Sequence, residues 1–148
     1  MSITNVNVGQ VMTDQVVTIG PCETMDKVNR IFETEKFHHL PIVDQEGKVL
    51  GMLSKSDYYR IQHGLTSFKL KKAEEYNNAI ARSLLVSDVM ITDVTTLSPD
   101  DNILIAVDIF NENLFHAMPV VNEHNQLVGI LSIIDLLNHA YMPHLLLK

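Results

Sequence analysis

The 148-residue sequence is poor in the residue types on which several classes of protein depend. Cys22 is its single cysteine, so neither an intramolecular disulfide nor a cysteine-based zinc cluster can form. No apolar run approaches the roughly 18 residues that a membrane span requires. Residues 1–10 have neither a basic start nor a continuous apolar core. We therefore predict no secretory signal, no membrane association and a cytoplasmic location.

Positive charge is also scarce. Eleven Lys and Arg residues stand against eighteen Asp and Glu residues, which gives a formal net charge of −7. Such a chain repels nucleic acid unless it has a local basic patch. The basic cluster from Lys69 to Lys72 is followed at once by Glu74 and Glu75, which is typical of a solvated helix face. We expect no nucleic-acid partner.

Sequence motifs of common enzymes are missing as well. The chain has no Gly-x-Ser-x-Gly elbow, no His-Glu-x-x-His, no Walker loop and no Gly-x-Gly-x-x-Gly. Cys22 has no neighbouring histidine to activate it. We therefore predict that the chain is not an enzyme. Its 46% of hydrophobic residues are nevertheless enough to build a core.

An internal repeat organises the chain. Shifting the sequence by 78 positions without a gap brings residues 8–59 onto residues 86–137 with 16 identities in 52 positions. A repeat of this kind predicts two copies of one structural unit. We assign residues 8–60 to the first copy, 61–85 to a helical linker, 86–139 to the second copy and 140–148 to an apolar tail.

Each copy has the same predicted order of elements. In the first copy, an extended stretch at residues 16–19 precedes an amphipathic helix near residues 25–32. Two strands at residues 40–43 and 49–53 flank a tight turn, and a second helix starts near Ser54. The order is β-α-β-β-α, an α/β (α+β) architecture. Because so small a sheet cannot cover its own apolar face, the two copies should pack together.

Four short motifs of the first copy resemble the cystathionine-β-synthase-type (CBS) repeat. They are Val8-x-x-Val-Met12, an extended Val-x-Thr followed by Pro, Leu40-Pro-Ile-Val-Asp44 and Gly51-Met-Leu-Ser-Lys-Ser-Asp57, and the second copy has an equivalent of each. The resemblance implies two repeats related by a pseudo-two-fold axis, with sheets packed face to face and paired clefts between them. It also implies a regulatory module that binds an adenosyl ligand such as AMP, ADP, ATP or S-adenosylmethionine and commonly forms a disc-shaped dimer.

The pairs Ser54 with Asp57 and Ser132 with Asp135 lie where a strand is expected to turn into a helix. In the family this motif contacts nucleotide. A carboxylate can accept hydrogen bonds from the cis-diol of a ribose, and a hydroxyl with free helix N–H groups suits a phosphate. The alternative is a capping box, which needs no ligand. The glycine that precedes each motif would let a ligand approach the backbone.

His38 and His39 precede the first predicted hairpin, and His116 followed by Ala117 holds the equivalent place in the second copy. In nucleotide-binding relatives a His-Arg pair at this place faces phosphate. Because an imidazole is cationic only near or below about pH 6.5, phosphate binding through His39 should be weaker and pH-dependent. The first copy is the better candidate for a charged ligand. Packing is the alternative role for these histidines, and metal ligation has less support.

The extended segments, residues 12–18 and 90–96, are expected to form the wall for the base. Each cleft should join the Ser-x-x-Asp of one copy to the extended segment of the other. Core packing is the alternative for their apolar members. The candidate contacts are Val16, Thr18, Ile19, Val94, Thr96 and Leu97.

Two expectations concern assembly and partners. The apolar tail at residues 145–147 favours a homodimer, because a soluble monomer seldom leaves such a tail in water. The module should regulate another protein, whose identity the sequence does not indicate. A ligand-free dimerisation or interaction scaffold is the alternative function.

Overall fold

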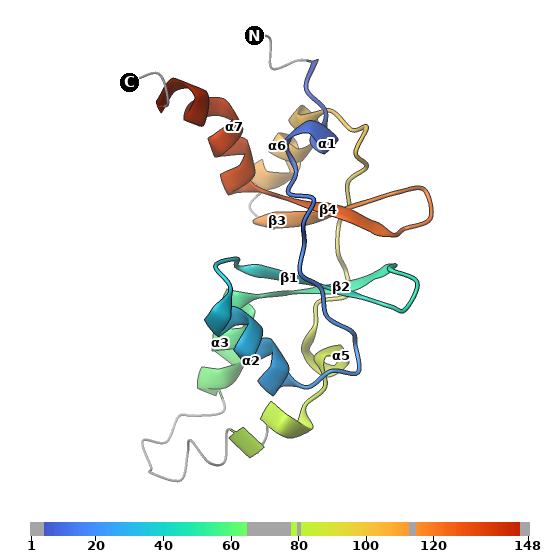
Figure 1. Ribbon diagram of the computed structural model, residues 1–148, viewed down its shortest axis with the longest axis vertical. Coiled ribbons are helices and arrows are strands. Elements are labelled where there is room, and N and C mark those ends of the chain that lie inside the picture. The colour runs from blue at the N-terminus through green and yellow to red at the C-terminus, as the bar shows by residue number, and fades with distance from the viewer. Residues whose placement is uncertain (1–4, 65–77, 80, 113–114, 146–148) are drawn as a thin grey trace. The chain divides into compact units, whose positions relative to one another are not determined.

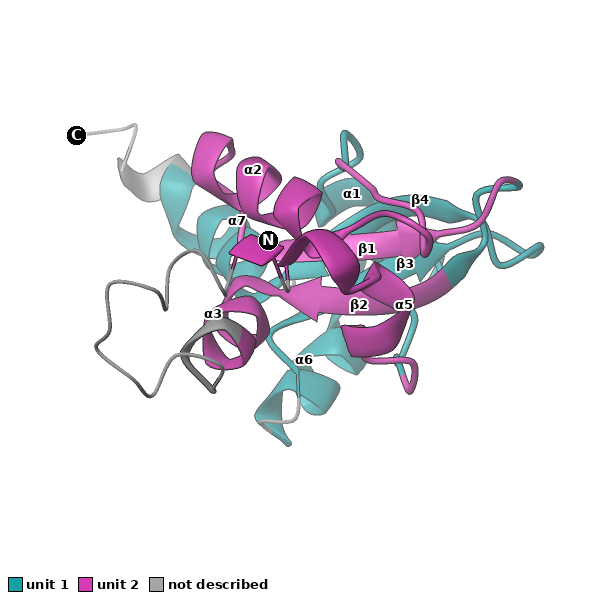
Figure 2. Ribbon diagram, turned by 90° about the horizontal axis from the view of Figure 1, so that it is seen from below, with its two compact units in different colours: residues 1–16, 46–49, 94–148 teal, residues 17–45, 50–93 magenta. Residues whose placement is uncertain are grey.

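The computed structural model describes residues 5–64, 78–79, 81–112 and 115–145 (Figure 1). The chain forms two compact units (Figure 2). Unit 1 comprises residues 1–16, 46–49 and 94–148, and unit 2 comprises residues 17–45 and 50–93. Each unit therefore combines most of one sequence repeat with the N-terminal segment of the other.

Among the residues that the structure describes, unit 2 contains a hairpin, two longer helices and a short helix, besides the helical residues 78–79 and 81–83. Its strands form a two-stranded sheet, although Val49 at the start of the second strand groups with unit 1. The elements are α2 (Met25–Thr34), β1 (His39–Val43), β2 (Val49–Ser54), α3 (Lys55–Gly64) and α5 (Val86–Val89).

The core of unit 2 draws on both repeats. Val86 of α5 is fully buried in it, and its N–H donates to the carbonyl of Glu23 at 2.8 Å. The N–H of Met25 donates to the carbonyl of Leu84 at 3.0 Å. The second repeat thus supplies one wall of the first repeat's core. The buried members are Ile19, Met25, Val28, Phe32, Leu40, Ile42, Leu53, Tyr58 and Val86.

Unit 1 repeats this plan with α1 in the place of α5. Its strands pair antiparallel, with Ala117 opposite Ser132 and an irregularity between Val120 and Val121. Its elements are α1 (Val8–Val11), α6 (Ile103–Asn111), β3 (Ala117–Val121), β4 (Leu127–Ser132) and α7 (Ile133–Leu145). Its buried core consists of Val8, Leu97, Ile103, Ala106, Phe110, Met118, Val120 and Leu131.

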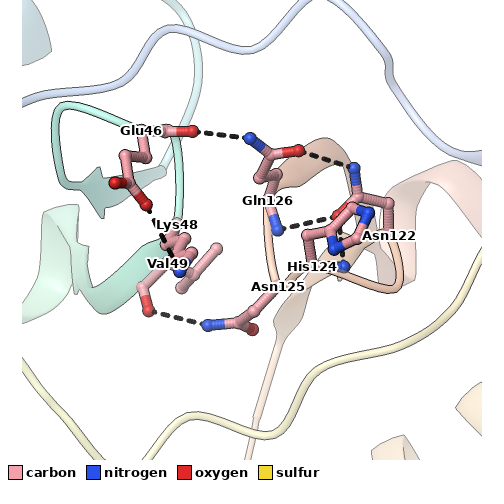
Figure 3. Close-up of polar contacts among 7 residues, drawn as sticks. All are labelled: Glu46, Lys48, Val49, Asn122, His124, Asn125 and Gln126. Carbon is pink, nitrogen blue, oxygen red and sulfur yellow. Dashed lines mark hydrogen bonds and ion pairs between the residues drawn. The ribbon is translucent and has the colours of Figure 1, made fainter.

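Within unit 1, the turn at residues 46–49 pairs with the turn between β3 and β4 (Figure 3). The N–H of Leu127 donates to the carbonyl of Gly47 at 2.9 Å, and the N–H of Val49 donates to the carbonyl of Asn125 at 3.1 Å. Gly47 and Asn125 occupy equivalent repeat positions with φ of 84° and 61°. Glycine and asparagine are the residues that adopt this left-handed conformation most readily, so both turns depend on them.

Side chains reinforce the paired turns. Gln126 Nε2 donates to the carbonyl of Glu46 at 2.8 Å. Asn122 Oδ1 accepts from the N–H groups of His124 and Gln126 at 2.9 and 3.0 Å, which closes the turn between β3 and β4 (Figure 3). These contacts satisfy backbone groups that a loop would otherwise leave to water.

The structure confirms the mixed α and β class, the two hairpins and the helices on either side of them. Residues 16–19 differ from the expected leading strand, because this segment makes only an isolated parallel bridge from Ile19 to Ile42, matched by Leu97 and Val120. The helices α1 and α5 were not predicted. No helix among the described residues is long and apolar enough to cross a membrane.

Two expectations lie wholly or partly outside the described residues. Of the proposed helical linker, residues 65–77 and 80 are not described, whereas residues 78–79 and 81–83 are helical. Residues 146–148 of the apolar tail are also outside the description, and α7 continues to Leu145.

Candidate functional site

In unit 2, β2 ends at Ser54 and α3 begins at the next residue. Ser54 Oγ accepts from the N–H of Asp57 at 3.0 Å, and the N–H of Lys55 donates to the carbonyl of His38 at 2.7 Å. Asp57 Oδ1 lies 3.5 Å from Arg60 Nη2, whose side chain is 79% exposed. An ion pair with so exposed a partner contributes little stability. The side chain of Asp57 is itself 20% exposed.

In unit 1, β4 ends at Ser132 and α7 begins at Ile133. Ser132 Oγ accepts from the N–H of Asp135 at 3.1 Å, while the N–H and hydroxyl of Ser132 donate to Asp135 Oδ2 at 2.8 and 3.0 Å. Thr13 Oγ1 donates to Asp135 Oδ1 at 3.1 Å. The N–H of Ile133 donates to the carbonyl of His116 at 3.2 Å, as at the other junction.

The capping role of the two serines is therefore a structural fact. Each Ser Oγ accepts from the backbone N–H three residues ahead, and in unit 1 Asp135 also reaches back to the N–H of Ser132. This satisfies helix N–H groups that have no partner within the helix. Ligand contact by the same residues stays a prediction, because a capping residue can still accept or donate toward a ligand.

An extended segment from the other repeat meets each junction. Thr13 and Ile130 exchange two backbone hydrogen bonds of 2.9 Å, and Met52 and Ile91 do the same at 2.9 Å. The strand that leads into each Ser-x-x-Asp thus pairs with the extended segment of the other copy, and the cleft that we expect between them stays a prediction. Two equivalent backbone frames result, one in each unit.

The glycine that precedes each motif has a different role from the one we predicted. A Cβ added to Gly129 would lie 2.5 Å from Met12 Sδ and 2.9 Å from the carbonyl oxygen of Thr13. A Cβ added to Gly51 would lie 2.7 Å from the carbonyl oxygen of Ile91. These glycines admit the neighbouring backbone, so the expectation that they leave room for a ligand is wrong.

The histidines differ in exposure. His38 and His116 are exposed one residue before the strands of the hairpins, while His39 is partly buried as the first residue of β1. The carbonyls of His38 and His116 accept from the first residues of α3 and α7, so the backbone of both residues belongs to the junctions. The described residues contain no group of three or more His, Cys, Asp or Glu side chains arranged to hold a metal ion.

The apolar and threonine candidates fall into two groups. Ile19 and Leu97 are 4% and 2% exposed and belong to the two cores, which favours the packing alternative for them. The others keep accessible surface: Thr18 and Thr96 are exposed, and Val16 and Val94 are half-buried.

Sequence reasoning missed two side chains of the junctions, Thr13 and Arg60. Thr13 touches Asp135 and Arg60 touches Asp57. A comparison of aligned repeat positions could have drawn attention to them, because Ile91 stands in the place of Thr13 and Asn138 in that of Arg60.

Curated relatives are longer proteins than this chain. It is 28% identical over 134 residues to a homoserine O-acetyltransferase of Methanococcoides burtonii and, also 28% over 134 residues, to an inosine-5′-monophosphate dehydrogenase of Methanocaldococcus jannaschii. Each match covers 90% of this chain, but only 24% and 23% of the respective relatives. The chain thus spans about a quarter of their length.

Solved structures share the fold. The CBSX2 structure in complex with AMP has a TM-score of 0.76 and 21% identity, covering 95% of this chain and 99% of that one. The CBS domain pair of MJ0100, in complex with 5′-methylthioadenosine and S-adenosyl-L-methionine, has a TM-score of 0.73 and 17% sequence identity. That match covers 93% of this chain and 98% of the other. The cytosolic domain of the Mg²⁺ channel MgtE, in complex with ATP, has a TM-score of 0.69 and 23% sequence identity. That match covers 90% of this chain and 48% of the other.

The family model of the CBS domain matches this chain twice, at residues 8–64 and 86–141. Both matches contain one complete hairpin, and each ends in the helix that follows a Ser-x-x-Asp junction. The fold shared with CBS-pair structures agrees with this assignment. The chain therefore belongs to the CBS domain family, as a tandem pair of CBS repeats.

Proposed function

We propose that this chain is a regulatory module, not an enzyme, which binds an adenine nucleotide or a related adenosyl compound beside its strand–helix junctions. The observation that carries the proposal is the doubled frame, in which each Ser-x-x-Asp junction meets the extended segment of the other repeat. Proteins with this fold have been solved with AMP, with ATP, and with 5′-methylthioadenosine and S-adenosyl-L-methionine. Their ligands support an adenosyl compound here.

The proposed roles follow from the chemistry of each group. The carboxylates of Asp57 and Asp135 would accept hydrogen bonds from the two ribose hydroxyls. The hydroxyls of Ser54 and Ser132, with the first N–H groups of α3 and α7, would lie toward the 5′ substituent. The extended segments carrying Val16, Thr18, Val94 and Thr96 would contact the base through their backbone groups.

Thermal melting with adenosyl ligands tests the proposal. A ligand present at about 100 times its Kd should raise the free energy of unfolding by about 2.7 kcal/mol. Asp57→Ala and Asp135→Ala should each weaken one site by about 1.5–3 kcal/mol, the range for hydrogen bonds to a charged group. If AMP, ATP, 5′-methylthioadenosine and S-adenosylmethionine all leave the melting temperature of the parent unchanged, the chain is not an adenosyl sensor.

A ligand-free scaffold is the second candidate, and one observation favours it at unit 1. Asp135 already receives hydrogen bonds from Thr13 and Ser132, so its carboxylate is satisfied without a ribose. A scaffold predicts that Asp135→Ala lowers stability and leaves ligand binding at the parent value. A sensor predicts that the same variant loses affinity at one site.

We also propose that the module forms a homodimer through α7 and passes its ligand state to a partner protein. Ile134, Leu137, Tyr141 and Met142 are 60%, 48%, 62% and 43% exposed. Their spacing of three, four and one places them along one side of the helix, and a symmetric dimer would cover them.

Light scattering at tens of micromolar decides between a dimer and a monomer. The dimer would have a mass of twice 16.7 kDa, and Leu137→Glu should return the chain to 16.7 kDa. The substitution Asn138→Gln on the same helix is the control, because it adds no charge. A parent mass near 16.7 kDa would show that α7 does not join two copies.

A further inference from the structure

We propose that the two junctions bind different classes of adenosyl ligand. The unit 2 junction, Ser54 with Asp57, takes an adenine nucleotide through its phosphate. The unit 1 junction, Ser132 with Asp135, takes an adenosyl compound without phosphate, such as a 5′-thioether or a sulfonium. The inference rests on the proposed function and adds the ligand class at each site.

The backbone of the two junctions is the same, so any difference in their ligands must come from the side chains. The same hydrogen bonds join strand, helix and extended segment in both units, with His38 and His116 at equivalent places. Several other positions around the junctions differ between the repeats, and three of them present side chains of unlike charge or polarity. They are Lys55 against Ile133, Arg60 against Asn138, and Ile91 against Thr13.

These differences change the local charge. In unit 2, the positive charges of Lys55 and Arg60 exceed the negative charge of Asp57, which gives 2 − 1 = +1 with histidine neutral.

In unit 1, Ile133 and Asn138 stand at the positions of these cations, so Asp135 leaves a charge of −1. A phosphate monoester carries roughly 1.5–2 negative charges at pH 7. It is attracted to the first junction and repelled by the second.

The cations of unit 2 are available to a ligand. Lys55 is the first residue of α3, and its ammonium lies 6.0 Å from the centre of the Tyr59 ring. Arg60 is 79% exposed and lies 3.5 Å from Asp57. Lys55 is partly buried, but its contact with the Tyr59 ring and the exposed ion pair of Arg60 are both weak, so either side chain can turn to a phosphate at small cost.

The unit 1 junction is apolar at the same place. Ile133 opens α7, packs partly against the unit 1 core and keeps part of its surface accessible. Its aliphatic side chain gains from covering a methyl or thioether group, whereas a phosphate placed there would lose water without a partner. The arrangement therefore favours a 5′ substituent that is uncharged or positive.

Calorimetry on the full chain with AMP and with 5′-methylthioadenosine tests the assignment. Asp57→Ala should weaken AMP binding about tenfold or more and leave methylthioadenosine binding at the parent value. Asp135→Ala should do the reverse. Equal losses of AMP affinity in both variants would overturn the inference while leaving the proposed function intact. Binding of neither ligand to the parent would overturn the inference, and failure of all four adenosyl ligands to stabilise the parent would overturn the proposed function as well.

Charge exchanges give a second, independent test. Arg60→Asn and Lys55→Ile should each lower AMP affinity, whereas Asn138→Arg should raise AMP affinity at the unit 1 junction several-fold. Asn138 and Arg60 are both exposed, so these exchanges should leave the melting temperature close to that of the parent.

Lys27→Ile is the matched control, because Lys27 lies on α2 in an exposed ion pair with Glu23, away from the junction. The inference is wrong if Lys27→Ile lowers AMP affinity as much as Lys55→Ile does. It is also wrong if Asn138→Arg leaves AMP affinity unchanged.

Discussion

In unit 1 the junction carboxylate Asp135 receives hydrogen bonds from a threonine and a serine, whereas in unit 2 its counterpart Asp57 faces an exposed arginine. The backbone around them is the same, with a glycine where the extended segment crosses the sheet. The comparison teaches that the identical repeat positions around the junctions are mainly those on which the frame depends. The units diverge at positions 13, 55 and 60 and their counterparts, whose side chains take no part in these backbone hydrogen bonds.

The largest expected effect tests whether the two cores contribute equally. Leu53 and Leu131 occupy equivalent positions and are both fully buried. Leu53→Ala and Leu131→Ala should each lower the free energy of unfolding by about 2–5 kcal/mol, because each leaves a cavity in a packed core. Urea unfolding measures both losses. A loss below about 1 kcal/mol in either variant would show that its unit is not a tightly packed core.

Alanine substitutions at Gly51 and Gly129, where the extended segments cross the hairpins, should destabilise the two units by different amounts. At Gly51 the nearest obstacle is the backbone oxygen of Ile91 at 2.7 Å, whereas at Gly129 it is the flexible side chain of Met12 at 2.5 Å. We expect a cost of about 1–3 kcal/mol for each, with Gly51→Ala the more damaging. Thermal melting tests this order. Gly20→Ala is the control, since its nearest atom would be 3.9 Å away.

Alkaline pH should destabilise unit 2 through Tyr58, a position that Leu136 occupies in unit 1. Tyr58 is 5% exposed, and its hydroxyl donates to Asn29 Oδ1 at 2.7 Å. Burial, followed by the negative charge of Glu33 and the neighbouring Tyr59, raises the pKa of Tyr58 above 10.0. The folded state favours the neutral phenol, so this stability is complete below pH 10 and is lost as the pH rises further.

The variant Tyr58→Phe should therefore cost about 1 kcal/mol near pH 7, from the lost hydrogen bond, and should lessen the decline above pH 10. Denaturant unfolding from pH 7 to 11 gives both quantities. Tyr59→Phe, at a 43% exposed tyrosine, is the control and should keep the parent's steepness. A decline as steep in Tyr58→Phe as in the parent would place the titrating group elsewhere.

The smallest effect concerns the residue that most clearly distinguishes the junctions. Thr13→Val should cost about 0.5 kcal/mol, because its hydrogen bond to Asp135 is exposed to water. Ile91→Thr should bring the same hydroxyl to the unit 2 junction beside Asp57.

Double-mutant cycles with Asp135→Ala and Asp57→Ala measure the two couplings. We expect a coupling free energy between Thr13 and Asp135 and none between Ile91 and Asp57. The substitution Ile91→Thr should create a coupling with Asp57. The comparison would fail if Thr13 and Asp135 proved to be independent.

The elements that the sequence predicted are those with local signals. The hairpins follow from apolar runs on either side of a polar turn, and α2 follows from apolar positions at helical spacing. The helices α1 and α5 have only four residues, too few to show a period, and their buried valines pack in the core of the other repeat. No local sequence pattern indicates that these valines pack in the core of the other repeat.

The site shows the same limit. Ser54 with Asp57 and Ser132 with Asp135 were found because the members of each pair are only three positions apart in the sequence. Thr13 was missed because its partner Asp135 lies 122 positions further along the chain. The role of Gly51 and Gly129 was misassigned because a ligand and a crossing backbone both require the absence of a side chain. Deciding between them needs the position of the neighbouring segment.

The two repeats exchange their short helices α1 and α5, and this exchange has a consequence for the chain during its synthesis. The ribosome synthesises Val8 long before the residues from Leu97 to Leu131 that bury it. The core around the first hairpin is likewise incomplete until Val86 has been synthesised. A nascent chain that stops after one repeat therefore displays an orphaned helix and an open apolar hollow at the same time. Chaperones bind such surfaces, so quality control would recognise a half-made pair sooner than two self-sufficient domains.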